Sequence, residues 1–274
     1  MFEPLPSCQL IVESSPESGD FNMAMDAALL SLALQRSESL VRIYRWKNPT
    51  VTLGYFQGAS GAGPADNMFP ELAVVRRLSG GGAILHHHEW TYSCILPPCH
   101  PARHNPSQLY QKVHLALIDL LIRCHAPCRL RGDSSATNAA GAAEPSEHFL
   151  CFLRGNANDI VHQSGNKIVG SAQRRRMGAI LQHGSVLLKA SCHTPNLPGL
   201  LDLNPEFDSE QFATELPETI AATVSHHWQR RMWTHEEVEL AAQFMTQTAT
   251  ESTQASSSST TRDSSTPVNR VSSP

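Results

Sequence analysis

Two adjacent arginines and three consecutive glycines form the first stretch whose residue types could do chemistry. Arg76 and Arg77 close an apolar run at 72–75 that predicts a buried strand. Glycines let the backbone adopt positive φ and approach a ligand closely, and guanidinium groups and free N–H groups bind phosphate or carbonyl oxygens. The stretch predicts a ligand-binding loop, although a glycine-rich turn with two solvated arginines would have the same sequence. The candidate binding residues are Arg76, Arg77, Ser79, Gly80, Gly81, Gly82, Ala83 and His86.

A lysine on an otherwise small and apolar strand is the second unusual feature. Lys167 follows the turn signal Ser-Gly-Asn at 164–166, so the residues on either side predict a hairpin. The small residues after Lys167 leave space for a ligand; alternatively, Lys167 is a solvated hairpin lysine. The candidates on this strand are Lys167, Gly170, Ser171, Ala172 and Gln173.

A polar triplet inside an apolar strand is the third feature. Gln-His-Gly occupies 182–184 within the apolar run 180–188. A single histidine in such a strand is also typical of a hydrogen-bonded core residue. His183 and Gly184 are therefore candidates in combination with the other two stretches.

Two clusters of potential metal ligands lack the spacing of a metal site. Residues 86–88 are three histidines, but successive strand residues point to opposite faces, so at most two point together. Cys124 and Cys128 flank His125 without a second ligand pair nearby, which favours helix-end core cysteines. The sequence predicts no metal site.

The composition limits the class of protein. The 274 residues are 41% hydrophobic with a net charge of −4, which argues against a nucleic-acid partner because phosphate neutralisation needs an excess of Lys and Arg. No apolar run reaches the ~18 residues of a membrane span, so no membrane partner is expected. The first residues include an acid and prolines where a signal peptide needs basic and apolar residues. Seven irregularly spaced cysteines predict reduced thiols and a cytoplasmic location.

The elements that position these stretches follow from two periodicities. Alternating or continuous apolar runs predict strands, and recurrence at i, i+3 and i+4 predicts helices. The expected strands are 9–13, 41–46, 51–56, 72–75, 91–96, 158–162, 167–173 and 180–188, with 41–46 and 51–56 as a candidate hairpin. The expected helices are 22–35 (capped by Asp20 or Asn22), 109–124, 205–216, 218–228 and 234–244 (capped by Thr234). This order predicts an α+β fold, with a mixed or antiparallel sheet flanked by helices.

The pattern predicts one domain over residues 1–245, followed by a tail. Residues 137–146 are rich in Ala, Gly, Pro and Glu and predict a surface insertion. Residues 246–274 are rich in Ser and Thr with almost no apolar side chains, so we expect a disordered tail.

Taken in order, the motifs resemble the lipoate–protein ligase A/octanoyltransferase family. They are Arg-Arg with the glycine triplet, Thr-Tyr-Ser at 91–93, Gly-x-Lys-Ile-Val-Gly-Ser-Ala-Gln at 165–173 and Leu-Gln-His-Gly-Ser at 181–185; residues 22–26 and 49–54 also match. The resemblance covers about residues 20–245. It implies the catalytic fold of biotin and lipoate ligases, related to class II aminoacyl-tRNA synthetases, and acyl transfer onto a lysine of a lipoyl domain.

The resemblance implies a thioester mechanism if Cys151 is the nucleophile. Cys151 precedes the lysine hairpin, similar to the catalytic cysteine of octanoyltransferases, and a nearby ammonium such as that of Lys167 stabilises a thiolate. Alternatively, Cys151 is a buried core cysteine. The transferase would need no cofactor, and its acyl pocket would be roofed by the glycine triplet and shaped by His86 and His183.

An ATP-dependent lipoate ligase is the alternative within the family. Asn158 and Asp159 resemble the Asn-Asp pair that ligases place before the lysine hairpin. In that case ATP and Mg would be required, Arg77 and the backbone of 82–85 would hold the nucleotide, and Lys167 would contact the acyl-adenylate. The short chain after residue 200 leaves no room for a ligase accessory domain, which favours transfer. A further alternative is a non-catalytic protein that binds a lipoyl domain or acyl carrier protein. The expected partners are octanoyl–acyl carrier protein and lipoyl domains, namely glycine cleavage H protein and the acyltransferase subunits of 2-oxoacid dehydrogenases.

Overall fold

A computed structural model describes residues 6–57, 64–133 and 148–259 of the chain. The predicted surface insertion at 137–146 lies outside the described residues. None of the helices in the described part combines the length and apolar character that crossing a membrane requires.

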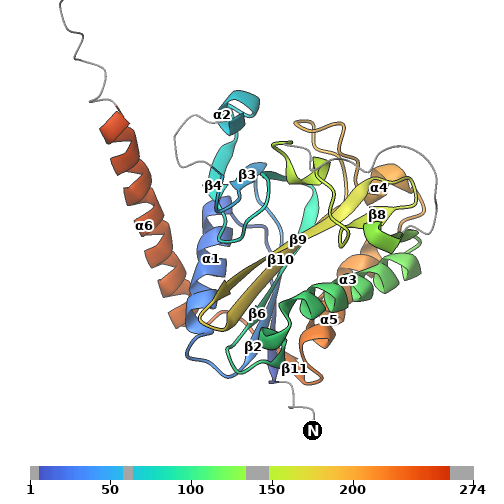
Figure 1. Ribbon diagram of the computed structural model, residues 1–274, viewed down its shortest axis with the longest axis horizontal. Helices are drawn as coiled ribbons and strands as arrows, with labels where there is room; N and C mark the ends of the chain where they lie inside the picture. Colours follow the sequence, from blue (N-terminus) through green and yellow to red (C-terminus); the bar gives the residue numbers. More distant parts are fainter. Residues whose placement is uncertain (1–5, 58–63, 134–147, 260–274) are drawn as a thin grey trace, which may run out of the picture.

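An eight-stranded mixed sheet forms the centre of the molecule (Figure 1). Across the sheet, the strands are β11 (Trp228–Arg230), β1 (Cys8–Val12), β2 (Ser39–Tyr44), β6 (Glu89–Leu96), β10 (Ala179–Leu187), β9 (Lys167–Arg176), β8 (Ile160–His162) and β7 (Cys128–Leu130). The first three run parallel and every later neighbour runs antiparallel. The predicted α+β class with a mixed sheet is confirmed.

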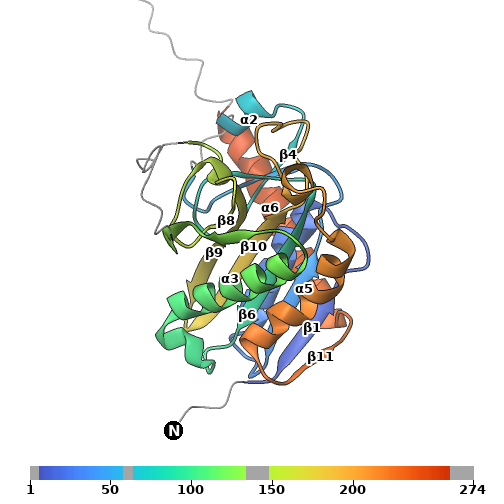
Figure 2. The ribbon, with the colours of Figure 1, turned by 90° about the vertical axis from the view of Figure 1, so that its right-hand side faces the viewer.

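Helices cover both faces of this sheet (Figures 1 and 2). Side chains on successive strand residues point to opposite faces, so Leu96 joins the core under α3 (Pro106–Arg123) and α5 (Ser209–Val224). Its neighbour Ile95 joins the core under α1 (Gly19–Leu32) and α6 (His235–Ser259). Continuous apolar runs in the central strands are explained by this double burial.

A three-stranded sheet packs beside the large one and carries the arginine–glycine stretch. Its order is β4 (Ala73–Arg76), β3 (Thr50–Leu53) and β5 (Ile84–His86), and the short helix α2 (Pro64–Met68) joins β3 to β4. The predicted hairpin of 41–46 with 51–56 is wrong, because β2 and β3 belong to different sheets. The run 72–75 is not buried either: β4 is a partly exposed edge strand.

Two helix predictions need correction. α1 starts at Gly19 instead of residue 22, because Ser18 is its N-cap and accepts a hydrogen bond from the Phe21 N–H at 3.3 Å. The predicted helices 205–216 and 218–228 are the single helix α5, which contains Pro217 and whose buried residues Leu216 and Ile220 lie on either side of that proline. The remaining short helices are α4 (Leu200–Leu203), η1 (Pro101–His104), η2 (Arg131–Asp133) and η3 (Cys151–Leu153).

The start of α6 confirms a predicted capping box. The Thr234 N–H donates to Glu237 Oε2 at 3.0 Å, and the Glu237 N–H donates to Thr234 Oγ1 at 3.3 Å. The helix does not end near residue 244 as predicted but continues to Ser259, into the segment expected to lack structure. Thr246 and Thr250 hydroxyls donate to carbonyls one turn earlier, so these polar side chains are compatible with the helix. Residues 260–274 lie outside the described part.

Candidate active site

A cavity of about 220 Å³ is bounded by both sheets and by α1. Most of the residues predicted from the sequence meet there. Those lining it are Arg77, Gly80, Gly81, His86, Cys151, Gly170, Ser171, Ala172, Gln173, His183 and Gly184. The apolar and aromatic lining was not predicted from the sequence and consists of Met23, Tyr44, Trp46, Ile84 and Phe152. The cavity therefore combines an apolar surface with a small number of polar groups, as ligand pockets do.

The structure places Cys151 and Lys167 next to each other. Lys167 Nζ lies 3.9 Å from Cys151 Sγ and 3.3 Å from the Cys151 carbonyl oxygen. Gly170 provides the space for this lysine, since a Cβ there would lie 2.8 Å from Lys167 Cε. The Cys151 N–H donates to the Ala83 carbonyl at 2.7 Å, which ties the cysteine to the glycine loop. An ammonium beside a thiol is the arrangement that favours a nucleophilic thiolate.

Asp159 is the counter-ion of Lys167. Its Oδ1 lies 3.0 Å from Lys167 Nζ, and both side chains are buried, with 3% and 4% exposed. Burial raises the pKa of the Asp159 carboxyl, while the charge of Lys167 lowers it. The Asn156 N–H also donates to Asp159 Oδ2 at 2.8 Å. Of the predicted Asn-Asp pair, Asp159 contacts Lys167, whereas the Asn158 carbonyl accepts a hydrogen bond from His114.

The guanidinium groups of Arg76 and Arg77 bind the loops around them. Arg77 is buried and donates to the carbonyls of Thr52, Gly80 and Gly82 at 2.7–3.0 Å. Burial lowers the pKa of Arg77 to about 10. Arg76 lies outside the cavity lining and donates to carbonyls of the segment after β3, including that of Gln57 at 2.6 Å. Both arginines therefore fix the glycine loop to β3 and to the loop that follows β3.

Glycine is required at the loop for steric reasons. Gly81 has φ of +98°, which side-chain-bearing residues rarely adopt. A Cβ on Gly82 would lie 2.9 Å from the Phe149 carbonyl oxygen, and one on Gly54 would lie 2.1 Å from that of Gly81. Gly81 and Gly82 therefore cannot carry side chains where the loop passes between the cysteine-bearing segment and β3.

His183 connects the cavity to a buried carboxylate. Its Nδ1 lies 3.0 Å from Asp26 Oδ2, and its Nε2 lies 2.5 Å from Ser79 Oγ at the start of the glycine loop. Asp26 on α1 also accepts from Ser93 Oγ at 2.9 Å and from Arg42 Nη1 at 3.3 Å. Ser79 is fully buried and does not line the cavity. Its hydroxyl instead lies against His183, at the start of the glycine loop.

His86 forms part of the cavity wall. Its ring stacks on Trp46 at a centroid distance of 3.8 Å. Its Nδ1 lies 2.7 Å from Glu89 Oε1, and its Nε2 lies 2.8 Å from Thr52 Oγ1. Burial lowers the pKa of His86 while Glu89 raises it. Both ring nitrogens of His86 are therefore occupied, and its ring lines the cavity.

A hydrogen-bonded chain that the sequence analysis missed supports Ser171. His114 Nδ1 lies 2.5 Å from the Asn158 carbonyl, so this nitrogen carries the proton. Its Nε2 then accepts from Ser171 Oγ at 2.6 Å, and Ser171 Oγ accepts in turn from the Tyr92 hydroxyl at 2.5 Å. Burial lowers the pKa of His114 to about 4, consistent with a neutral ring. The sequence does contain a signal for this role: His114 lies on the apolar face of the expected helix 109–124.

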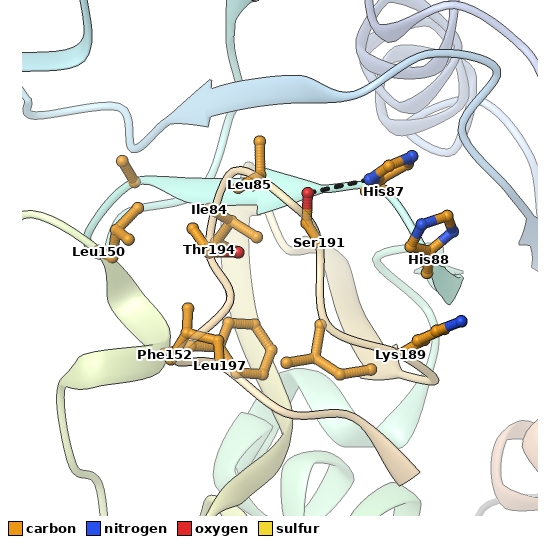
Figure 3. Close-up of a pocket in the computed structure, with 12 residues that line it drawn as sticks. Ile84, Leu85, His87, His88, Leu150, Phe152, Lys189, Ser191, Thr194 and Leu197 are labelled. Atoms are coloured by element: carbon orange, nitrogen blue, oxygen red, sulfur yellow. Dashed lines mark hydrogen bonds between the residues drawn. The ribbon is translucent and has the colours of Figure 1, made fainter. Parts of the chain in front are cut away.

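Outside the cavity, a second and smaller pocket lies beside β5 (Figure 3). Leu150, Phe152 and Leu197 form one part of its wall, and His87 and His88 lie at another. The two histidines stack at a centroid distance of 3.6 Å, while His86 faces the cavity instead. Within the described residues, no three His, Cys, Asp or Glu side chains gather in a geometry that could hold a metal ion.

Solved structures define the class of fold. A crystal structure of lipoate-protein ligase A bound with ATP superposes with a TM-score of 0.65 and 18% identity, covering 89% of this chain and 95% of that one. The catalytic fold of lipoate ligases predicted from the sequence is therefore confirmed.

A family model gives the more specific assignment. The lipoyl protein ligase A/B catalytic domain model matches residues 18–242, so the chain belongs to this family. Octanoyltransferase LipM of Oceanobacillus iheyensis is 33% identical over 65% of this chain and 63% of the relative. Octanoyltransferase LipM of Lysinibacillus sphaericus is 31% identical over 75% of this chain and 74% of the relative. The chain thus spans less than two thirds of the first relative's length.

Proposed function

We propose that the protein transfers an octanoyl group from acyl carrier protein to a lysine of a lipoyl domain, through a thioester on Cys151. The observation that carries this proposal is the 3.9 Å separation of Cys151 Sγ and Lys167 Nζ beside a partly apolar cavity. The two relatives described above bear the name octanoyltransferase, which supports the same chemistry.

The first half-reaction forms the acyl-enzyme. The Cys151 thiolate attacks the thioester carbonyl of the donor, and the carrier thiolate leaves and takes up a proton. Lys167 stabilises the thiolate before attack, and Lys167 with the β9 backbone at Gly170 and Ser171 stabilises the oxyanion. The octanoyl chain occupies the cavity against Trp46 and Met23.

The second half-reaction forms the amide. The neutral ε-amine of the acceptor lysine attacks the Cys151 thioester, the carbon–sulfur bond breaks, and the amine proton is released while the thiolate is restored. The reaction needs no cofactor, and its kinetics are ping-pong. The proposed acceptors are lipoyl domains, including those of glycine cleavage H protein and 2-oxoacid dehydrogenase acyltransferase subunits. We propose a cytoplasmic location, in line with seven unpaired cysteines.

ATP-dependent lipoate ligation is the second candidate because the fold is that of lipoate ligases. ATP and Mg would then be required. The two arginines expected at the phosphates, however, donate to backbone carbonyls of neighbouring loops. These hydrogen bonds serve the loop in either mechanism, so it is the position of Cys151 beside Lys167 that favours the transferase.

Intact-mass measurement of the enzyme after mixing with octanoyl–acyl carrier protein tests the proposal. We expect a mass increase of one octanoyl group on the wild type and on Cys192→Ala, which removes an exposed cysteine elsewhere. Cys151→Ala should gain no mass and should not acylate a lipoyl domain. An active Cys151→Ala variant, or pyrophosphate release from ATP and lipoate without an adduct, would contradict the thioester mechanism.

A further inference from the structure

The exposed end of β9 carries three consecutive arginines, Arg174, Arg175 and Arg176, which we call the arginine edge. Arg174 and Arg176 point to one face of the strand and Arg175 to the other. Figure 1 shows the β9–β10 hairpin extending along the sheet to a turn at its free end. No ion pair joins any of the three to a carboxylate within the described residues. In a chain of net charge −4, this edge is a local concentration of positive charge.

Aromatic and apolar side chains extend this surface. The Arg174 guanidinium lies over the Tyr55 ring at 4.5 Å. Phe56, which is 83% exposed, lies beside Gly80 at the cavity wall, where an added Cβ would be 3.8 Å from its ring. Met177 follows the arginine edge and is 80% exposed. Exposed Arg, aromatic and Met side chains together are the composition of protein interfaces.

The arginine edge follows directly after the part of β9 that lines the cavity. Gly170 to Gln173 line the cavity, and Arg174 is the next residue of β9. At a strand rise of ~3.3 Å per residue, Arg174 and Arg175 lie about 13 and 17 Å along β9 from Gly170, the residue beside Lys167.

The distance from Gly170 to the arginine edge can be compared with the reach of the reacting group of each expected partner. A phosphopantetheine arm has about thirteen bonds from phosphorus to sulfur, and an extended chain gains ~1.2 Å per bond, so it spans about 15 Å. A lysine side chain has about five bonds from Cα to Nζ and reaches only about 6 Å. A carrier with its sulfur at Cys151 would place its phosphate near the arginine edge, whereas an acceptor lysine at Cys151 requires its domain much closer.

We propose that the arginine edge, with Tyr55 and Phe56, is the docking surface for the acyl carrier protein that donates the octanoyl group. The arginines bind the arm's phosphate and carboxylates of the carrier around it, and Phe56 contacts the apolar part of its surface. This proposal rests on the transferase function proposed above and adds the place where the donor binds.

Single-turnover acylation of Cys151, followed by intact mass, tests this surface in the full-length protein. The variants are Arg174→Gln/Arg175→Gln/Arg176→Gln and the charge-retaining triple Arg→Lys replacement. Three reactions are compared. Two are acylation of Cys151, by octanoyl–acyl carrier protein and by the small phosphate-free thioester octanoyl-N-acetylcysteamine. The third is transfer from the preformed acyl-enzyme to a lipoyl domain. A control, Arg123→Gln/Arg230→Gln, removes exposed arginines on α3 and β11.

We expect the Gln triple variant to lower the rate with octanoyl–acyl carrier protein by about ten-fold or more at low salt, with a smaller salt dependence than the wild type. The Lys variant and the control should retain most of that rate. Acylation by the small thioester and transfer to the lipoyl domain should change by less than about two-fold.

Unchanged acylation by the carrier would overturn the docking proposal, as would a loss confined to lipoyl-domain transfer, because the surface would then serve the acceptor. A wild type that no thioester acylates would instead refute the transferase function, and the docking proposal with it.

Discussion

The buried pair of Lys167 and Asp159 leads to a specific prediction for Asp159→Asn. The substitution keeps the size of the side chain and an oxygen near Lys167 Nζ, but it removes the negative charge. Both partners are at least 96% buried and 3.0 Å apart. Removing one partner of a buried ion pair costs about 3–5 kcal/mol. Since asparagine still accepts a hydrogen bond, we expect the lower end, about 3 kcal/mol in the free energy of unfolding.

The same change should slow acylation. Without Asp159, no carboxylate holds Lys167 Nζ in position beside Cys151 Sγ. We expect the single-turnover rate of Cys151 acylation by a small octanoyl thioester to fall by about ten-fold or more at pH 7, or about 1.4 kcal/mol.

Urea unfolding followed by fluorescence gives the stability, and intact mass against time gives the rate. Asp119→Asn removes an exposed carboxylate on α3 and serves as the control, with little expected change. If Asp159→Asn unfolds within about 0.5 kcal/mol of the wild type and acylates at the same rate, the ion pair neither stabilises the fold nor positions the lysine.

Two further predictions follow from the chain of hydrogen bonds at Ser171. The pKa of His114 is lowered from about 6.5 to about 4, so the unfolded chain binds more protons between these values and stability falls as pH decreases. From pH 7 to 5 this histidine should cost about 2 kcal/mol of unfolding free energy, and His114→Gln should show a correspondingly flatter pH dependence in urea unfolding; parallel pH curves would refute this assignment. Gly184→Ala would place a Cβ 2.4 Å from Ser171 Oγ and 2.6 Å from the Tyr92 hydroxyl, so we expect a loss of about 1–3 kcal/mol and slower acylation by the small thioester; a variant with wild-type stability and acylation rate would show that the site can relax.

Most of the residues predicted for the site line one cavity, whereas the connections between the elements were predicted less well. Hydrophobic runs identified most strands, and the Lys167 hairpin and the Thr234 cap are confirmed. Which strand pairs with which was harder to predict, because a run of apolar residues does not specify its neighbour in the sheet. β2 and β3 were therefore joined as a hairpin although they belong to different sheets.

Roles inside the site depend on distances that residue types do not encode. His114 is distant in sequence from the three motifs and acts through Ser171 and the Asn158 backbone. Asp26 falls within the expected helix 22–35 and was not among the candidate site residues, yet its carboxylate lies 3.0 Å from His183 Nδ1. Both are polar residues on apolar helix faces, and only the fold shows which groups satisfy them.

The arginine–glycine stretch shows why a motif can predict a site and still leave its chemistry open. A glycine loop with buried carbonyls needs hydrogen-bond donors, and Arg77 supplies them to Gly80 and Gly82. This requirement exists whether or not a phosphate binds, so the presence of arginine beside glycine cannot separate a ligase from a transferase. A cysteine thiol within reach of Lys167 bears directly on the choice, since acyl-adenylate chemistry needs no nucleophilic side chain there while a thioester mechanism does.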